Sequence, residues 1–281
     1  MTCSQKYSTL QESECFGSKI SDRLIGDRFS ENGFGQSRTV LDQEIVDSLN
    51  GELDCFLSRA SLGRRGNQIV SRFGEHESER GWKINNLWET CSGFLSVAIR
   101  PDILSEIARI TGARTIRLWR DQLLVKAPGP RSDVKWHQDA FWWSVLSPAT
   151  QVTAWIALDR VSVENGCMLM AAKSHRCGLQ TNLINAVNSG RVALGDINER
   201  YSLTDVKLPC GGIHYHHCLT WHASHPNLSA STRRAYAIHY MIDDTYITPN
   251  SRHPIADALT VDADGRLCGE AFPLLWSSDK R

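Results

Sequence analysis

Residues 213–242 read IHYHHCLTWHASHPNLSASTRRAYAIHYMI, and this stretch decides the fold class. Both ends are rich in β-branched and aromatic residues, whereas the middle is rich in Pro, Asn and Ser. This composition predicts one strand over 213–224 that ends near His222, then a turn, then a second strand over 233–242. Similar short runs precede it: TIRLWRDQLLVKAP (115–128), QVTAWIALDRV (151–161) and GCMLMAA (166–172).

Few helical runs separate these strands, which argues against a parallel α/β sheet and favours a β-sandwich or barrel, with a jelly roll among the options. Helices are expected upstream. Apolar residues recur at the helical period in 39–60, and a second helix is expected over 100–113, with Pro101 in its first turn and Gly112 at its end. Residues 61–87 hold four glycines without a period, which predicts a long lid or binding loop.

The composition is that of an ordinary globular protein. The chain has 281 residues, and its 31 Lys and Arg balance 31 Asp and Glu, so it lacks the field that attracts nucleic acid or anionic membranes. Its nine cysteines contain no C-x-x-C pair, and the N-terminus lacks an apolar signal core. We therefore expect a cytoplasmic protein with no nucleic-acid or membrane partner. Residues 1–20 are expected to form a flexible arm, and 21–281 a single domain; oligomeric state leaves no signal.

A candidate metal site starts from VKWHQDAFWW (134–143), in which His137 and Asp139 lie two residues apart. On a strand such residues project from one face, with α-carbons about 7 Å apart, so both side chains can reach one ion. Alone, this pair is more often a histidine hydrogen-bonded to a carboxylate. Among the histidines of 211–225 we choose His222 as the third ligand and interpret His216 and His217 as packing or hydrogen-bonded residues.

Two histidines and one carboxylate leave coordination positions open, as in non-heme Fe(II) oxygenases. Many of these enzymes bind 2-oxoglutarate, whose distal carboxylate suits the planar fork of an arginine. Strand alternation places Arg233 on one face with Ala235 and Ala237, which leaves room for a small dicarboxylate. The alternative is that Arg233 is an ordinary surface residue.

Four stretches in order resemble the phytanoyl-CoA dioxygenase family of Fe(II)/2-oxoglutarate-dependent oxygenases. They are WHQDAFWW (136–143), TAWIALDRVSVENGCMLMAAKSHR (153–176), HHCLTWHASHPNLSASTRRAYAIHY (216–240) and, more weakly, FSENGFGQSRTVLDQEIVDSLNGEL (29–53). The resemblance implies a mainly β protein with flanking helices and a double-stranded β-helix core, which is a cupin-like jelly roll. It also implies Fe(II), 2-oxoglutarate and O2 as cofactor and co-substrates.

The resemblance also assigns residues. It places the iron ligands at His137, Asp139 and His222, and the arginine for the distal carboxylate of 2-oxoglutarate at Arg233. Further candidates around the co-substrate are Ser224, Trp155, Thr153 and Gln122. Lys126 is a candidate contact of co-substrate or substrate, and Trp142 and Trp143 are candidates for lining the substrate mouth. The turn VENGCM (163–168) is interpreted as structural.

The expected reaction hydroxylates a small molecule, most plausibly in natural-product metabolism, while 2-oxoglutarate becomes succinate and CO2. A carboxylate at Asp139 argues against a halogenase, since related halogenases carry a small residue there. Desaturation, epoxidation and ring formation remain alternatives within this class. Two further alternatives are an inactive β-barrel binding protein and a zinc hydrolase with the same ligands. We expect residues 61–90 and 177–207 to form the substrate pocket.

Overall fold

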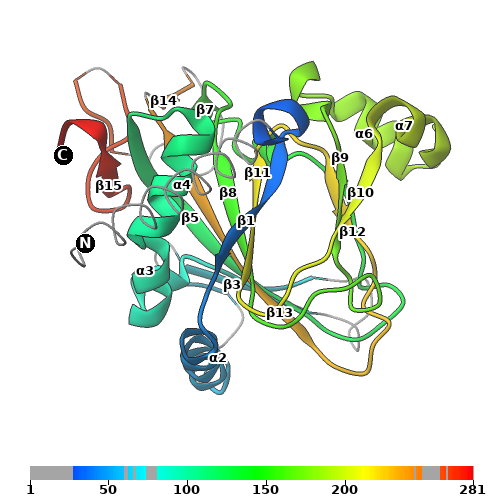
Figure 1. The fold of residues 1–281 in the computed structure, drawn as a ribbon, viewed down its shortest axis with the longest axis horizontal. Coiled ribbons are helices and arrows are strands. Elements are labelled where there is room, and N and C mark those ends of the chain that lie inside the picture. Colours follow the sequence, from blue (N-terminus) through cyan, green and yellow to red (C-terminus); the bar gives the residue numbers. More distant parts are fainter. Residues whose placement is uncertain are drawn as a thin grey trace, which may run out of the picture.

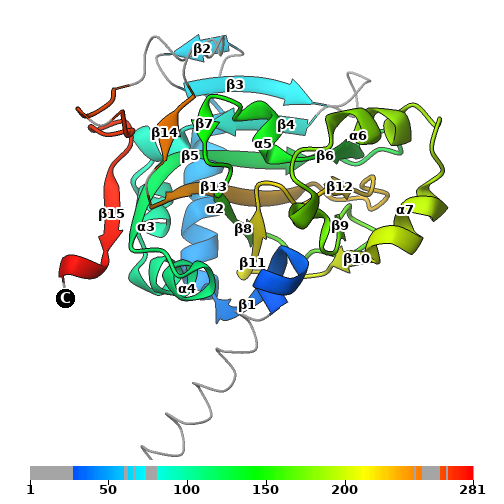
Figure 2. The same cartoon turned by 90° about the horizontal axis from the view of Figure 1, so that it is seen from above.

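The fold was analysed in a computed structural model that describes residues 28–59, 63–65, 68–73, 81–243, 245–248, 260–263 and 265–280. Within these residues two antiparallel sheets, here called the major and the minor sheet, make up the core (Figures 1 and 2). The predicted arm, 1–20, lies outside the described residues. No helix of the described part combines the length and apolar character that a membrane span requires.

The major sheet runs in the order β1-β11-β8-β13-β5-β4-β3-β2, with β15 also paired to β5. Its strands are β1 (Phe34–Val40), β11 (Gly212–His217), β8 (Val152–Ala157), β13 (Arg233–Ile242), β5 (Thr115–Lys126), β4 (Gly81–Asn85), β3 (Gln68–Phe73), β2 (Gly63–Arg65) and β15 (Leu274–Ser277). The minor sheet runs β10 (Leu203–Val206), β9 (Met168–Ala171), β12 (His222–Ser224) and β6 (Val134–His137). A short pair joins β14 (Tyr246–Ile247) to β7 (Leu146–Ser147).

Helices cover the outer faces of both sheets (Figures 1 and 2). On the major sheet lie α2 (Gln43–Leu57), α3 (Ser92–Ala98) and α4 (Pro101–Thr111), whose apolar side chains share one cluster with the outward residues of β5, β8, β11 and β13. On the minor sheet, α6 (Thr181–Asn188) and α7 (Leu194–Tyr201) pack in a second cluster. Short helical turns occur at η2 (Leu87–Glu89), α5 (Asp139–Trp142), η3 (Ser174–Cys177) and η5 (Ser278–Lys280). Because the outer faces are covered, the inner faces are left to form the site.

Strand alternation in β13 separates these two environments as expected. Tyr236 and Ile238 belong to the cluster beneath the helices, whereas Ala235 and Ala237 face inward. The Tyr236 hydroxyl contacts the carbonyl of Phe94 at 3.1 Å and so ties the sheet to α3. The predicted mainly β jelly-roll core with flanking helices is confirmed.

Three sequence predictions need correction. Residues 213–224 form two strands in different sheets, β11 and β12, because the chain crosses from the major to the minor sheet between His217 and His222. Residues 61–87 are not one long loop, since β3 and β4 extend the major sheet beyond β5 through backbone pairing. The helix predicted over 39–60 begins only at Gln43, because residues 39–40 pair with β11 as the end of β1.

Candidate active site

The three predicted metal ligands meet between β6 and β12. His137 is the last residue of β6 and His222 the first of β12; they are paired in register, and their ring centroids lie 4.0 Å apart. Asp139 follows at the start of α5, and the candidate ligand atoms of all three residues lie within 4.8 Å of one another. The site therefore has the composition of a 2-His-1-carboxylate centre.

The prediction that His137 and Asp139 share one strand needs correction, although they do point the same way. Asp139 lies in α5, but the backbone of the intervening Gln138 is still extended, with φ −122° and ψ 132°. Alternation therefore continues for one residue past the strand. The buried Gln138 amide donates to the carbonyls of Gly178 and Leu219 at 2.8 and 2.7 Å, so this side chain stabilises the chain where it leaves β6.

Backbone carbonyls hold the two imidazoles in the tautomer that a metal requires. Nδ1 of His137 lies 2.8 Å from the carbonyl oxygen of Lys135, and Nδ1 of His222 lies 3.0 Å from that of Thr220. Since a carbonyl can only accept, each Nδ1 carries the proton and each Nε2 keeps a lone pair for the ion. Burial, together with the neighbouring His222, lowers the pKa of His137 to about 3, so its ring is neutral at physiological pH.

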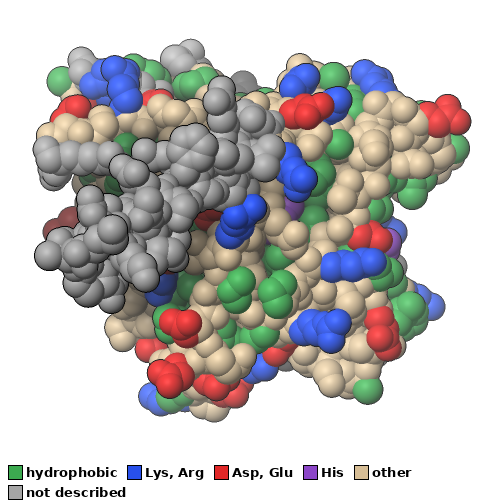
Figure 3. Space-filling model, viewed as in Figure 1, with side chains coloured by type: hydrophobic (Ala, Val, Ile, Leu, Met, Phe, Trp, Pro, Cys, Tyr) green, Lys and Arg blue, Asp and Glu red, His purple; other side chains and the backbone are tan. Residues whose placement is uncertain are grey.

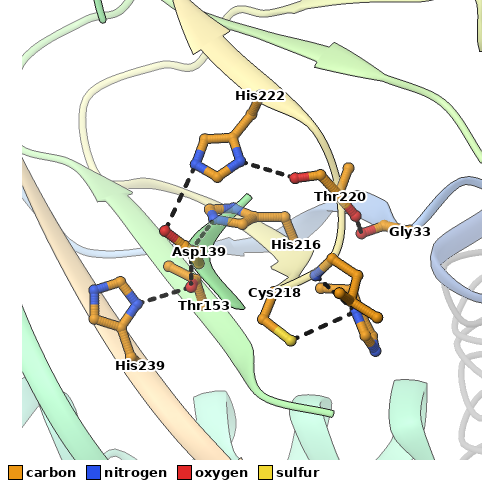
Figure 4. A network of polar contacts seen from close by, with 10 residues as sticks. Gly33, Asp139, Thr153, His216, Cys218, Thr220, His222 and His239 are labelled. Atoms are coloured by element: carbon orange, nitrogen blue, oxygen red, sulfur yellow. Dashed lines mark hydrogen bonds and ion pairs between the residues drawn. The ribbon is translucent and has the colours of Figure 1, made fainter. Parts of the chain in front are cut away.

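Hydrogen bonds also orient the Asp139 carboxylate (Figure 4). Its Oδ2 accepts from Thr153 Oγ1 at 3.2 Å and from His216 Nε2 at 3.3 Å, while Oδ1 lies 3.8 Å from His222 Nε2. Burial by itself raises the pKa of Asp139, but His222 and the His216 hydrogen bond outweigh it and lower the pKa well below the usual range. The carboxylate is therefore ionised, and Oδ1 is the oxygen left for a metal.

At the other end of the cavity a cation is buried. Arg233 is 3% exposed; its Nη2 donates to the carbonyl of Gly166 at 3.3 Å, and Nε and Nη1 have no hydrogen-bond partner among the described residues. Its guanidinium carbon lies 5.1 Å from the Trp155 ring centroid. Burying a cation with unsatisfied donors is costly. This end is therefore suited to an anion such as a carboxylate, which would satisfy a free guanidinium N–H with a charge-assisted hydrogen bond.

Lys126 adds a second basic side chain at the Arg233 end. It lies opposite Arg233 in the β13–β5 pairing, and its Nζ donates to Ser224 Oγ and to the carbonyl of His225, both at 2.6 Å. Burial, followed by the charge of Arg233, lowers the pKa of Lys126 to about 7. The structure thus places Lys126 and Ser224 beside Arg233, where a co-substrate carboxylate would lie.

One cavity of about 170 Å³ connects the two ends. Both sheets contribute, and the lining includes the three predicted metal ligands with Gln122, Lys126, Thr153, Trp155, Ser224 and Arg233. Gln122 contributes to the lining as predicted, and the Thr153 hydroxyl contacts Asp139 and lies 2.8 Å from His239 Nδ1.

The two candidate substrate aromatics lie outside this lining. Trp143 is 3% exposed, and its ring packs edge-on against His239 at 4.7 Å, so it supports the cavity wall from behind. Trp142 is 59% exposed on α5. Of the two, only Trp142 presents its ring to solvent.

The lining residues that sequence reasoning missed include Lys83, Met168, His216 and His239. His239 could have been found, because it continues the inward series that starts at Arg233. Lys83 was hidden by the prediction of a loop over 61–87; in β4 it faces the cavity, and burial lowers its pKa, with the charge of Arg120 adding to the effect. His216 was interpreted as a hydrogen-bonded residue, which agrees with its contact to Asp139.

A jelly roll that encloses a 2-His-1-carboxylate site beside a buried arginine defines the class of non-heme iron oxygenases. The family model for phytanoyl-CoA dioxygenase (PhyH) matches residues 29–235. The chain therefore belongs to the phytanoyl-CoA dioxygenase family of Fe(II)/2-oxoglutarate-dependent oxygenases.

Two curated relatives match about half of the chain. A phytanoyl-CoA dioxygenase of Arabidopsis thaliana is 28% identical over 143 residues, which is 50% of each chain. A probable alpha-ketoglutarate-dependent hypophosphite dioxygenase of Stutzerimonas stutzeri is 27% identical over 155 residues, which is 53% of each chain. The match thus spans about half the length of these relatives.

Solved structures resemble a larger part of the chain. The alpha-ketoglutarate-dependent carbocyclase SnoK from nogalamycin biosynthesis has a TM-score of 0.72 and 25% identity, covering 89% of this chain and 94% of its own. The epimerase SnoN from the same biosynthesis has a TM-score of 0.70 and 22% identity, covering 92% and 100%. At 22% identity, the likeness to SnoN supports the fold alone.

Proposed function

We propose that this protein is an Fe(II)/2-oxoglutarate-dependent oxygenase that oxidises a small molecule. The observation that carries the proposal is the pairing, in one cavity, of the His137–Asp139–His222 centre with a buried Arg233 whose Nε and Nη1 have no partner among the described residues. A zinc hydrolase would have no use for that cation, and an inactive protein would need it only if it still bound the anion. Bound Fe(II), with 2-oxoglutarate and O2, supplies the oxidising power, and 2-oxoglutarate leaves as succinate and CO2.

The chain's own residues divide the work. His137 and His222 offer neutral Nε2 donors, and Asp139 offers Oδ1 because Thr153 and His216 occupy Oδ2. Three protein ligands leave the remaining positions to co-substrate and O2. The ligand set contains no vacancy for a halide, since Asp139 is present, so oxygenation is favoured over halogenation.

Two cationic groups suit the distal carboxylate of 2-oxoglutarate, and a third suits the metal end. Arg233 and Lys126 lie opposite each other on β13 and β5, and Trp155 packs beside the guanidinium. Lys83 lines the same cavity. Burial lowers the pKa of Lys83, whereas the negative charge of Asp139 raises it and so favours the charged amine. We assign Lys83 to the carboxylate of the co-substrate that lies nearest the iron.

Hydroxylation of a natural product is the leading reaction, and ring formation is the second candidate. SnoK, which is 25% identical and similar over 89% of this chain, is described as a carbocyclase from nogalamycin biosynthesis. This likeness supports a natural-product substrate and gives ring formation more weight than desaturation or epoxidation.

The direct test is anaerobic loading of the purified protein with Fe(II) and 2-oxoglutarate. We expect the weak visible charge-transfer band of the chelate, and then, in air, release of succinate that increases with an accepted substrate. His137→Ala should abolish the band. Absence of both band and succinate in the unaltered protein would overturn the proposal, whereas a band without substrate-stimulated turnover would support the binding-protein alternative.

A further inference from the structure

A second group of metal-binding side chains lies at the far ends of three minor-sheet strands. Cys167 immediately precedes β9, Asp205 is within β10, and His225 immediately follows β12. Their candidate ligand atoms, one sulfur, one carboxylate oxygen and one imidazole nitrogen, lie within 4.8 Å of one another. We propose that Cys167, Asp205 and His225 form a second metal site that binds a divalent ion of the zinc type.

The sheet register brings these residues together. β12 and β9 pair Ser224 with Met168, so the next residues outward, His225 and Cys167, are also opposite, and the His225 amide donates to the Cys167 carbonyl at 3.0 Å. Asp205, on the other side of β9, pairs with Leu169 and lies diagonal to Cys167. Backbone pairing of three adjacent strands thus fixes the relative positions of the three candidate ligands.

The proposed site is separate from the His137–Asp139–His222 centre. Met168 and Ser224 line the central cavity, whereas none of Cys167, Asp205 and His225 does. Cys167 packs in the same inner cluster as Met168 and Ala237, which line the cavity, so the second site adjoins the cavity without lining it. On the face drawn in Figure 3, acidic and basic side chains are interspersed along the right-hand side, on the side of the minor sheet.

The donor set selects the kind of ion. Thiolate, imidazole and carboxylate together match zinc, which accepts all three and is tetrahedral, so that one position stays open to water. The side chains of His225 and Asp205 are 31% and 34% exposed, which gives an ion a route in, while Cys167 is buried. Without metal, His225 Nε2 lies 2.8 Å from Asp205 Oδ1, so the ion would replace this contact.

Charges near Cys167 limit the affinity. Burial, and then the charge of Asp205, raises the pKa of the Cys167 thiol to about 11, whereas the charges of Lys207, Arg233 and Lys126 lower it. Metal binding must therefore remove a proton from a buried thiol and tolerate nearby cations. These costs favour a reversible site over a permanently filled structural one.

A reversible ion here would act on the Arg233 end of the cavity through the backbone. The carbonyl of Gly166, next to Cys167, accepts from Arg233, and the carbonyl of His225 accepts from Lys126. Holding Cys167 and His225 together would therefore fix the acceptors that orient both cationic side chains. This regulatory consequence rests on the proposed function, whereas the metal site itself does not.

Cobalt(II) titration of the full chain tests the site. A cobalt–thiolate bond produces an intense near-ultraviolet charge-transfer band, and the His137–Asp139–His222 centre has no thiolate. We expect this band to develop in the unaltered protein with a second equivalent of cobalt, after the His137–Asp139–His222 centre has filled, and to persist in His137→Ala. It should vanish in Cys167→Ser and remain in the matched control Cys218→Ser, which removes another fully buried free thiol.

Asp205→Asn provides a variant that is safe for folding, because the side chain is one-third exposed. It should weaken the cobalt affinity read from this band by roughly tenfold or more, since removing even an outer hydrogen-bond partner of a metal ligand costs about 10- to 100-fold. No near-ultraviolet band in the unaltered protein, or a band that survives both Cys167→Ser and Asp205→Asn, would overturn the proposal. Failure of 2-oxoglutarate binding would leave this result unchanged, so the two proposals fail separately.

Discussion

The two ends of the central cavity are built in opposite ways. At the metal end, backbone carbonyls fix both imidazoles, and Thr153 and His216 fix Asp139, so the three ligands are oriented before any ion arrives. At the other end, Arg233 is buried with two N–H donors that lack a partner among the described residues. The metal end is preorganised, whereas the Arg233 end carries a desolvated charge that only an anion relieves.

This difference predicts that substitutions at the metal end remove binding, whereas those at the Arg233 end shift an affinity. His222→Ala should have the largest effect, because a ligand is lost. Its loss of Fe(II) or Co(II) affinity should exceed the roughly 10- to 100-fold caused by removing an outer hydrogen bond. Equilibrium dialysis measures it. His217→Ala is the matched control, since His217 does not line the cavity; equal losses in both variants would mean that His222 is not a ligand.

Arg233→Ala should come next. Losing charge-assisted hydrogen bonds of about 1.5–3 kcal/mol corresponds to an increase of roughly 10- to 150-fold in the Kd for 2-oxoglutarate, with metal affinity unchanged. The chain offers a matched control in Arg234→Ala, because Arg234 faces away and forms an ion pair with Asp159 at 2.7 Å. Titration of the metal–2-oxoglutarate charge-transfer band compares them. If the two variants bind 2-oxoglutarate alike, the anion site has been assigned to the wrong arginine.

A smaller effect is expected from the groups that orient Asp139. His216→Phe keeps a buried ring but removes the hydrogen bond to Oδ2, and should weaken Co(II) binding by roughly tenfold and alter the visible d–d spectrum. His214→Phe is the control, because His214 lies on the same face of β11, whereas the hydrogen bond to Asp139 comes from His216. An identical spectrum in His216→Phe and the unaltered protein would show that this hydrogen bond does not orient the ligand.

The smallest effect is a pH dependence at the Arg233 end. Because the pKa of Lys126 is lowered to about 7, its charge is lost as pH rises through 7. The affinity for the 2-oxoglutarate dianion should therefore be highest below this pKa and fall between pH 7 and 9, by at most about tenfold per pH unit. Lys126→Arg should flatten the profile, since an arginine stays charged. Arg233, whose charge also acts on Lys126, stays charged through most of this range, because burial lowers its pKa only to about 10. A profile in Lys126→Arg that matches the unaltered protein would assign the dependence to another group.

The sequence predicted what alternation and residue chemistry determine, and failed where tertiary pairing decides. The inward series from Arg233 to Ala237 follows from period and residue type. The pattern left a jelly roll as one option among sandwiches and barrels, and the family resemblance selected it. The same resemblance supported the choice of His137, Asp139 and His222, whose ligand atoms do converge. The crossing between β11 and β12 could not be predicted from the sequence. Two apolar runs joined by a short turn have the sequence pattern of one continuous strand, even when they belong to different sheets.

Lys83 shows the second kind of failure. Glycines and charges hid the strands β3 and β4, whose pairing with β5 supplies the order that the local sequence lacks. The hydrogen bond by which His216 orients Asp139 likewise connects residues 77 positions apart, and the local sequence at either position does not indicate it.

The division of the cavity between two sheets has a mechanical consequence. The metal ligands come from β6, α5 and β12 on the minor-sheet side, whereas Arg233 and Lys126 come from β13 and β5 of the major sheet. A dicarboxylate bound at both ends would link the major sheet to the minor sheet across the cavity. By mass action, saturation at 100 times Kd adds about 2.7 kcal/mol to the free energy of unfolding. The co-substrate would thus stabilise the fold that positions it. This stabilisation would be lost each time the co-substrate is consumed and regained when the next molecule binds.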